Sequence, residues 1–501
     1  MKTMSIKSWT LGLVAAATLL ASCSKDFLNT TPVGRDLEVN YYKTQGQAFE
    51  ALVSIYDVLQ WNDQHGFTMF RMLQNTASDD TYAGGSAASD QPAWVAYDNF
   101  TLTSSLGPQA GLWKRNYKGI YRANLYMEKI EGVDATVAFK ERTTAEAKFL
   151  RAKFYFDLVR LFGEVLYIDH TLSPSEYYEV EQVPAATTYA LIIDDLEDAI
   201  EGLPATVASA DIGRATKGAA EALLARVYLF MDDAANMSKV VTLCESVINS
   251  GLYQLEADYE DIFKESNEWG VESVFEITYS TNSTVGWEVF GSGYGEGNVG
   301  VQFVGMRDYN GPDYAPGWGF CPISTELEAF MDGDPRYEHT IIDADNITGG
   351  EYTPGYQNTG YFIKKYAPLT SNLSSDGEPA LNWGNNIREI RYADVLLMAA
   401  EGLVRSGGSE GTARAYVNQV RSRVGLPGIS SSGTQLLEDI YKERRLELAT
   451  EGHRFFDLVR TGQASAVLGS SGFVSGVHEV LPIPQNEIDA SYGALNQNTG
   501  Y

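Results

Sequence analysis

The sequence predicts a mainly α-helical protein: a tetratricopeptide-like helical-repeat scaffold (an α-α superhelix) with loop-rich insertions and a few short β-strands. Apolar residues recur three and four positions apart in several segments, which is the period of a helix. These segments come in pairs. The pairs from about Thr216 to Asn249 and from about Tyr392 to Val424 each have close to the roughly 34 residues of a tetratricopeptide unit. Because the full repeat consensus is absent, a generic helical bundle remains the alternative.

The first residues have the pattern of an export signal. Two lysines precede an apolar stretch from Leu11 to Leu20, which is too short to span a bilayer. The motif Leu20-Ala21-Ser22-Cys23 then fits a bacterial lipobox, in which a peptidase cuts just before a lipidated cysteine. We therefore expect residues 1–22 to be a lipoprotein signal peptide and Cys23 to carry the lipid that anchors the protein. An ordinary secretory signal with a chance cysteine is the alternative.

Residues 23–501 are expected to form a single body. The predicted helical repeats cover about 40–75, 112–250 and 388–465. The predicted loop-rich regions cover about 76–111 and 255–387. Within the second region, Thr284 to Gly360 contains 15 of the 47 glycines, and such interruptions prevent a long helix. Binding residues tend to lie on loops that a rigid scaffold positions, so we expect the site in these two regions.

Charge and composition narrow the classes of function. The chain has 66 Asp and Glu against 37 Lys and Arg, a formal net charge of −29, which repels phosphate backbones and excludes nucleic-acid binding. With 44% apolar and 21% charged residues, the chain has the composition of a globular protein. The 30 Tyr and 8 Trp combine a flat apolar body with a polar atom, so some of them are expected to serve a binding surface.

Two cysteines remain besides Cys23. Cys244 lies on the apolar face of a predicted helix, and Cys321 lies in a segment rich in Gly and Pro. A disulfide between Cys244 and Cys321 remains an alternative, but nothing in the sequence pattern supports it. A buried free thiol is the favoured interpretation of Cys244.

Catalytic and metal motifs are absent or misplaced. The sequence has no HExxH, no CxxC and no P-loop. The GxSxG match at Gly407–Gly411 lies between two helical segments and is interpreted as a turn. The GxGxxG match at Gly295–Gly300 is interpreted as a glycine-rich loop that no helix follows. A calcium-like start at Asp343 lacks later ligands, so structural calcium is unsupported, and we expect no metal, cofactor or catalytic residue.

An ordered series of motifs runs along the chain. In the C-terminal third they are Arg391-Tyr392-Ala393-Asp394-Val395-Leu396-Leu397-Met398, Asn418-x-x-Arg421-x-Arg423-x-Gly425, Glu443-Arg444-Arg445-x-Glu447-Leu448, Glu451-Gly452-His453-Arg454-Phe455-Phe456-Asp457-Leu458-x-Arg460 and Leu481-Pro482-Ile483-Pro484. Earlier motifs are Phe27-Leu28, Trp113-x3-Tyr117 and Phe149-Leu150-Arg151-Ala152. Together they closely resemble the SusD/RagB family of outer-membrane nutrient-binding lipoproteins.

The resemblance implies a tetratricopeptide-like body whose loops form a shallow glycan site. It implies binding of extracellular oligosaccharides without catalysis, and delivery to a SusC-like TonB-dependent transporter. It also implies a surface-exposed protein that a lipid anchors in the cell outer membrane. The acidic surplus favours neutral over sulfated glycans. The alternative is a tetratricopeptide-type envelope scaffold that binds a protein partner and no glycan.

The resemblance also carries over candidate ligand-binding residues. Family sites use an arc of aromatic rings, because sugars present flat C–H faces that lie against Trp and Tyr. The residues that match family positions are Trp94, with Tyr97 and Asp98 nearby, Tyr294 and Trp318. Residues expected to add polar contacts or further rings are Arg71, Asp79, Asp80, Trp287 and Trp383. Each of these residues has a role in local packing as its alternative.

The motifs of the C-terminal third also carry charges at helical spacing. Opposite charges three or four residues apart on a helix can pair and pin neighbouring helices. The residues in question are Arg444, Arg445, Glu447, Glu451 and Arg454. The nearby His453 is interpreted as a packed scaffold residue and not as a catalytic group.

Overall fold

The computed structural model describes residues 42–62, 67–281, 286–289 and 295–501. The fold is mainly helical and tetratricopeptide-like, as predicted. The long helices are α3 (Gln45–Gln60), α6 (Gln109–Ile130), α7 (Val137–Phe162), α8 (Ala185–Gly202), α9 (Lys217–Phe230), α10 (Met237–Asn249), α14 (Tyr392–Arg405), α15 (Glu410–Arg423) and α16 (Gly433–Leu448). Within these ranges every helix is too short or too polar to cross a membrane.

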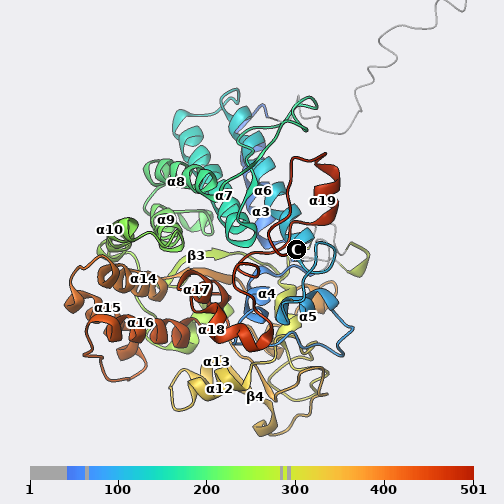
Figure 1. Cartoon of the computed structure of the whole chain (residues 1–501), viewed down its shortest axis with the longest axis vertical. Helices are drawn as coiled ribbons and strands as arrows, with labels where there is room; N and C mark the ends of the chain where they lie inside the picture. The colour runs from blue at the N-terminus through green and yellow to red at the C-terminus, as the bar shows by residue number, and fades with distance from the viewer. Residues whose placement is uncertain (1–41, 63–66, 282–285, 290–294) are drawn as a thin grey trace, which may run out of the picture.

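The helices pack in sequence and form one continuous array. Each helix from α6 to α10 packs against the next one along the chain. Helix α10 then packs against α14, which continues through α15 and α16, so the array runs on across the long insertion between them (Figure 1). The pairs α9–α10 and α14–α15 occupy the two segments in which tetratricopeptide-like units are predicted. The turn between α14 and α15 contains the GxSxG match, and its Ser409 caps α15 by accepting a hydrogen bond from the Thr412 N–H.

Helix α7 packs against four helices of the array, α3, α6, α8 and α9. Thr136 caps its first turn by accepting a hydrogen bond from the Phe139 N–H at 3.2 Å. Its last two-thirds are buried on nearly all sides, with the charged residues Arg151, Lys153, Asp157 and Arg160 among them. Burying a charge is costly unless it is paired. The interior of the protein must therefore contain a network of ion pairs around α7.

A two-stranded ribbon holds both ends of the loop-rich insertion. Strands β3 (Ser273–Ile277) and β6 (Ile387–Arg391) pair antiparallel, with Ile277 opposite Ile387, so the chain from 278 to 386 leaves and returns at one place. The other ribbons pair β1 (Val165–Leu166) with β2 (Gln182–Val183), and β4 (Ile341–Asp343) with β5 (Tyr361–Ile363). The short helices are α4 (Phe70–Thr76), α5 (Pro92–Asp98), α11 (Val299–Val304), α12 (Thr325–Met331), α13 (Tyr337–Thr340), α17 (Arg454–Arg460), α18 (Ala464–Leu468) and α19 (Gln485–Ala490).

The glycine-rich motif Gly295–Gly300 corrects one prediction, because a short helix does follow it. Helix α11 begins at Val299, where the Asn298 side chain accepts a hydrogen bond from the Gly300 N–H at 3.0 Å. Gly297 is required by close packing, since a Cβ there would lie 2.1 Å from the Leu381 carbonyl oxygen. The cap and the apolar residues of α11, which are all buried, outweigh the glycines.

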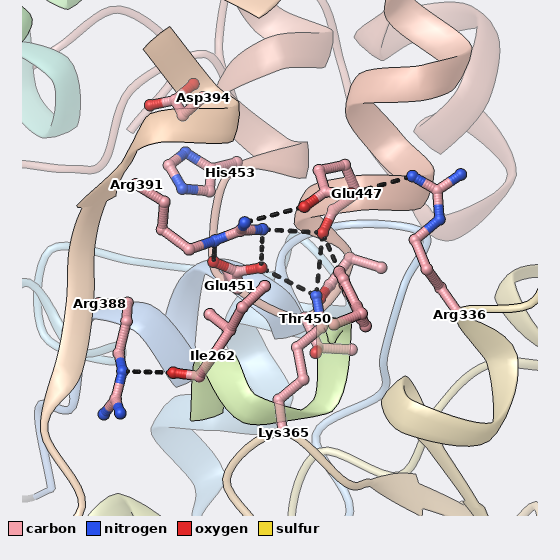
Figure 2. A network of polar contacts seen from close by, with 12 residues as sticks. Ile262, Arg336, Lys365, Arg388, Arg391, Asp394, Glu447, Thr450, Glu451 and His453 are labelled. Atoms are coloured by element: carbon pink, nitrogen blue, oxygen red, sulfur yellow. Dashed lines mark hydrogen bonds and ion pairs between the residues drawn. The ribbon is translucent and has the colours of Figure 1, made fainter. Parts of the chain in front are cut away.

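Two of the charged residues in the C-terminal motifs, Glu447 and Glu451, lie in a buried network of ion pairs (Figure 2). Glu447 accepts hydrogen bonds from Arg391 at 2.8 Å, Arg336 at 3.0 Å and Arg423 at 2.5 Å. Glu451 pairs with Arg391 and with Lys365, both at 2.8 Å. The partners of these two acids come from four other segments of the chain and not from positions three or four residues away, which corrects the expected pairing within a helix. The network joins α16 to β6, α15 and the loop-rich insertion.

The two described cysteines are free and buried. They form no disulfide, and the interpretation of Cys244 as a buried free thiol is confirmed. Burial raises the pKa of both thiols well above the ordinary value, so neither is a reactive thiolate.

Candidate functional site

Two tryptophan rings lie together at the surface of the loop-rich region. Trp287, in the short 3-10 helix Trp287–Val289, is 49% exposed, and Trp318 is half-buried beside it. Their ring centroids are 6.0 Å apart and their planes differ by 27°. Such a pair offers the flat apolar faces against which a ring-shaped ligand can lie. We refer to Trp287 and Trp318 as the tryptophan pair.

Backbone bonds and packing hold Trp318 in place. Its N–H donates to the Gln302 carbonyl oxygen at 2.9 Å, so its segment runs beside α11. Gly317 permits this close approach, since a Cβ there would lie 2.3 Å from the backbone of Gly305. The Trp318 ring packs edge-on against Phe303 of α11, with ring centroids 5.1 Å apart. The position of the ring is therefore set by the rigid core and not by its own loop.

A groove of about 360 Å³ lies next to Trp318. Its apolar wall consists of Phe67, Phe303, Trp318 and Phe320, and its polar residues are Ser86, Asp90, Gln91, Arg307 and Asp308. The Arg307 and Asp308 side chains lie 3.6 Å apart. Rings on one wall with carboxylate, amide and guanidinium groups nearby suit a ligand that has both C–H faces and hydroxyls.

The sequence reasoning did not select these polar groups. Only Arg307 had a feature in the sequence that could have indicated a role in the site, because it is one of only two Lys or Arg residues between Thr284 and Gly360.

A larger groove of about 570 Å³ lies beside α9 and α10. Tyr253 is the sole aromatic residue in its lining, so it offers a much smaller stacking surface.

Trp94 corrects a prediction, because it lies beneath the site and not in it. Its side chain is 0% exposed, and its indole N–H donates to the Phe67 carbonyl oxygen at 3.1 Å. Its ring packs against Phe303 and Phe320, with centroids 5.1 and 5.8 Å away. Trp94 therefore supports the aromatic wall of the groove from below and offers no face to a ligand.

Most of the other residues predicted to contact the ligand are also buried, and their polar atoms bond to other groups of the protein. Tyr97 is buried and donates to the Gln74 side chain at 3.0 Å, and Trp383, which is 0% exposed, donates to Gln302 at 3.2 Å. Arg71 is buried and pairs with Glu389 at 2.5 Å. These three residues are structural, which corrects their assignment as ligand contacts. Tyr294 lies outside the described residues.

Asp79 and Asp80 bind arginines of the C-terminal motifs. Asp79 accepts from Arg454 at 2.7 Å and pairs with Arg445 at 2.8 Å, while Asp80 pairs with Arg445 at 3.1 Å. The expectation that these acids bind ligand hydroxyls is corrected, because the arginines already occupy their carboxylates. Among the described residues, no group of three or more His, Cys, Asp or Glu is arranged to hold a metal ion.

Asp98 is a buried acid that ties two loops together near the groove. Its carboxylate accepts hydrogen bonds from the Ala83 N–H at 2.9 Å and from the Gln357 side chain at 2.8 Å. Gln357 in turn accepts from the Gly84 N–H at 3.1 Å. Burial raises the pKa of Asp98 to about 6, although both hydrogen bonds lower it. Asp98 therefore positions the loops and does not contact a ligand, which corrects its predicted role.

We expect Asp98 to make stability fall as pH rises. Because its pKa is higher in the folded protein than in the unfolded chain, the stability that it contributes is present below about pH 4 and is lost as pH rises through about 6. The loss is at most about 3 kcal/mol. Asp98→Asn should remove this pH dependence in urea unfolding curves, whereas the exposed Asp313→Asn should keep it. An unchanged profile in Asp98→Asn would contradict the assignment.

Comparison with known proteins identifies relatives over nearly the whole chain. Residues 272–501 match the model of the SusD family, and residues 37–229 match a model described as starch-binding and associating with the outer membrane. SusD-like protein P2 of Formosa agariphila is 28% identical, over 99% of this chain and all of that protein.

Solved structures agree with these matches. A laminarin-binding SusD-like protein is 39% identical with a TM-score of 0.86, over 92% of this chain and all of that one. Surface glycan-binding protein A of Bacteroides thetaiotaomicron, in complex with laminarihexaose, is 33% identical with a TM-score of 0.83, over 91% of this chain and all of that one.

Proposed function

Since this chain belongs to the SusD family, we propose that it binds oligosaccharides at the cell surface and delivers them, without catalysis, to a SusC-like TonB-dependent transporter. In this proposal the lipid on Cys23 anchors the protein in the outer membrane. The family supports glycan binding, and the match to an outer-membrane-associated model supports the location.

The tryptophan pair is the observation that carries the proposal. The two rings are adjacent and partly exposed, and Trp318 packs against the buried ring of Phe303, which Trp94 supports in turn. By analogy with base stacking, each ring contributes roughly 1 to 3 kcal/mol to binding. Association costs several kcal/mol, so the resulting affinity is micromolar to millimolar. Such weak binding suits a protein that passes its ligand on.

We propose laminarin-type oligosaccharides as the ligand class. Two of the similar structures are described as binding laminarin or laminarihexaose. Laminarin is an uncharged glucan, and the net charge of −29 on this chain favours uncharged sugars over sulfated ones. The Asp90, Arg307 and Asp308 side chains in the groove would take the hydroxyls of the sugar.

A glycan panel tests this proposal. In affinity gel electrophoresis, the mature protein should be retarded by laminarin and not by sulfated polymers such as heparin. Albumin run in the same gels is the control for non-specific retardation. Retardation by heparin alone would contradict the proposed ligand class, and release of shorter products from laminarihexaose would contradict the non-catalytic role.

A further inference from the structure

A small, partly open cavity lined mainly by buried residues lies apart from the groove. It has a volume of about 30 Å³ and is lined by residues from α4, α6, α7 and β6. The charged and amide side chains in its wall that matter here are Asn62, Arg71, Arg115, Lys153, Asp157 and Glu389, and all of them are buried. A cavity of this size has room for one small ion or one or two water molecules.

Arg115 is a buried cation with too few partners. It is 5% exposed, and its hydrogen bond from Nη1 to the Thr68 carbonyl oxygen is long, at 3.4 Å. Its Nε is buried without a hydrogen-bond partner, and no carboxylate among the described residues lies within ion-pair distance of it. A buried guanidinium without a counter-charge is costly, so something must compensate it.

The nearby carboxylates are already shared among other cations. Asp157 pairs with Lys153 and Arg160, each at 2.5 Å. Glu389 pairs with Arg71 at 2.5 Å, Arg226 at 3.4 Å and Lys153 at 3.5 Å. Arg226 also pairs with Asp394 at 2.6 Å. The charged side chains that line the cavity itself are the cations Arg71, Arg115 and Lys153 and the acids Asp157 and Glu389, a surplus of one positive charge.

A second donor in the cavity wall lacks a partner. The Asn62 Oδ1 accepts a hydrogen bond from the Tyr279 hydroxyl at 3.2 Å, which orients the amide. The Asn62 Nδ2 is then buried without a partner in the described structure. Two polar atoms in this wall thus lack a hydrogen-bond partner in the described structure, Asn62 Nδ2 and Arg115 Nε. Both are donors, so the occupant of the cavity must be an acceptor.

We propose that this cavity binds one small monovalent anion, chloride in a saline medium, between Arg115 and Asn62. A water molecule would accept the two hydrogen bonds but would leave the surplus charge uncompensated. The anion would satisfy both donors and neutralise Arg115. It would thereby stabilise the packing of α6 against α4 and α7, independently of any glycan.

Bromide replaces chloride in such sites and can be located by anomalous diffraction. Crystals of the mature protein grown in sodium bromide should show an anomalous peak in contact with Arg115 Nε and Asn62 Nδ2. A cavity that contains only water, with no anomalous signal, would overturn the proposal.

Unfolding in two salts gives a second test. At constant ionic strength, the thermal midpoint in sodium chloride should exceed that in sodium gluconate by roughly 2 °C or more. Arg115→Gln should abolish the difference. Asn62→Asp should abolish it too, because its carboxylate supplies the charge and Arg115 is kept. Arg122→Gln, on the same helix but partly exposed and paired with Asp57, should keep the difference. A difference as large as the wild type's in either cavity variant, or no difference in the wild type, would refute the site.

Discussion

Replacing Glu447 with alanine is expected to destabilise the protein by about 3 to 5 kcal/mol, because it removes a counter-charge that three buried arginines share. Glu447 is 0% exposed and receives hydrogen bonds from Arg336 and Arg391 (Figure 2) and also from Arg423. Arg391 would keep Glu451 and Glu272, whereas Arg423 would keep Glu272 alone among its acidic partners in the described structure. Urea unfolding followed by circular dichroism would measure the loss.

The matched control lies on the same helix. Glu438 is exposed on α16, so Glu438→Ala should change the free energy of unfolding by less than about 0.5 kcal/mol. Equal stability of Glu447→Ala and Glu438→Ala would show that the ion pairs of Glu447 do not hold the C-terminal helices to the insertion.

Glu447 is also expected to make the stability of the protein fall in acid. Burial alone would raise the pKa of Glu447, but Arg423, Arg391 and Arg336 hold it well below the ordinary value. Its folded pKa is below its unfolded pKa, so its contribution to stability is present above about pH 4.5 and is lost as pH falls below that value. This dependence of stability on pH is opposite in sign to that of Asp98. Unfolding curves of Glu447→Ala and Asp98→Asn therefore separate the two contributions to stability.

The second large effect concerns binding. Replacing Trp287 with alanine should weaken laminarihexaose binding by about tenfold or more, since one stacking ring is removed. Trp287 is exposed, so its loss should leave the free energy of unfolding almost unchanged. In the double variant Trp287→Ala/Trp318→Ala, binding should become undetectable by isothermal titration calorimetry.

An exposed ring elsewhere gives the control for this effect. Tyr121 is 44% exposed on α6 and is not part of the groove lining. Tyr121→Ala should bind laminarihexaose like the wild type. Loss of binding in Tyr121→Ala, or wild-type binding in the double variant, would show that the tryptophan pair is not the stacking surface.

The helical scaffold could be predicted because its signals are local. The apolar period that marks Leu223, Leu224 and Val227 depends on neighbours within two turns, and α9 lies where that period predicts it. Helix α11 was missed because the Asn298 cap and the buried Val299 and Phe303 outweigh a run of glycines that usually interrupts helices. Its stability depends on the core against which it packs, and the local sequence does not contain that information.

The site was harder to predict, because the depth of a ring depends on distant partners. Trp94 and Trp318 are both loop-region tryptophans that match family positions, yet Trp94 lies under Phe303 while Trp318 lies at the surface. In the same way, the partners of Glu447 are 24, 56 and 111 residues away. Helical spacing predicts only neighbours three or four residues away. The resemblance predicts a site in the loop-rich regions, and the three-dimensional packing shows which of its tryptophans are exposed and which are buried.

The tryptophan pair is proposed to bind a neutral glycan. Calorimetric titration of the mature protein with laminarihexaose, side by side with the double variant Trp287→Ala/Trp318→Ala, tests this proposal. We predict saturable binding with a micromolar to millimolar dissociation constant in the wild type and none in the double variant, with a cooperative unfolding transition in both proteins as the check on folding. Equal binding by both proteins, or no heat with laminarihexaose or any other neutral glycan, would contradict the proposal.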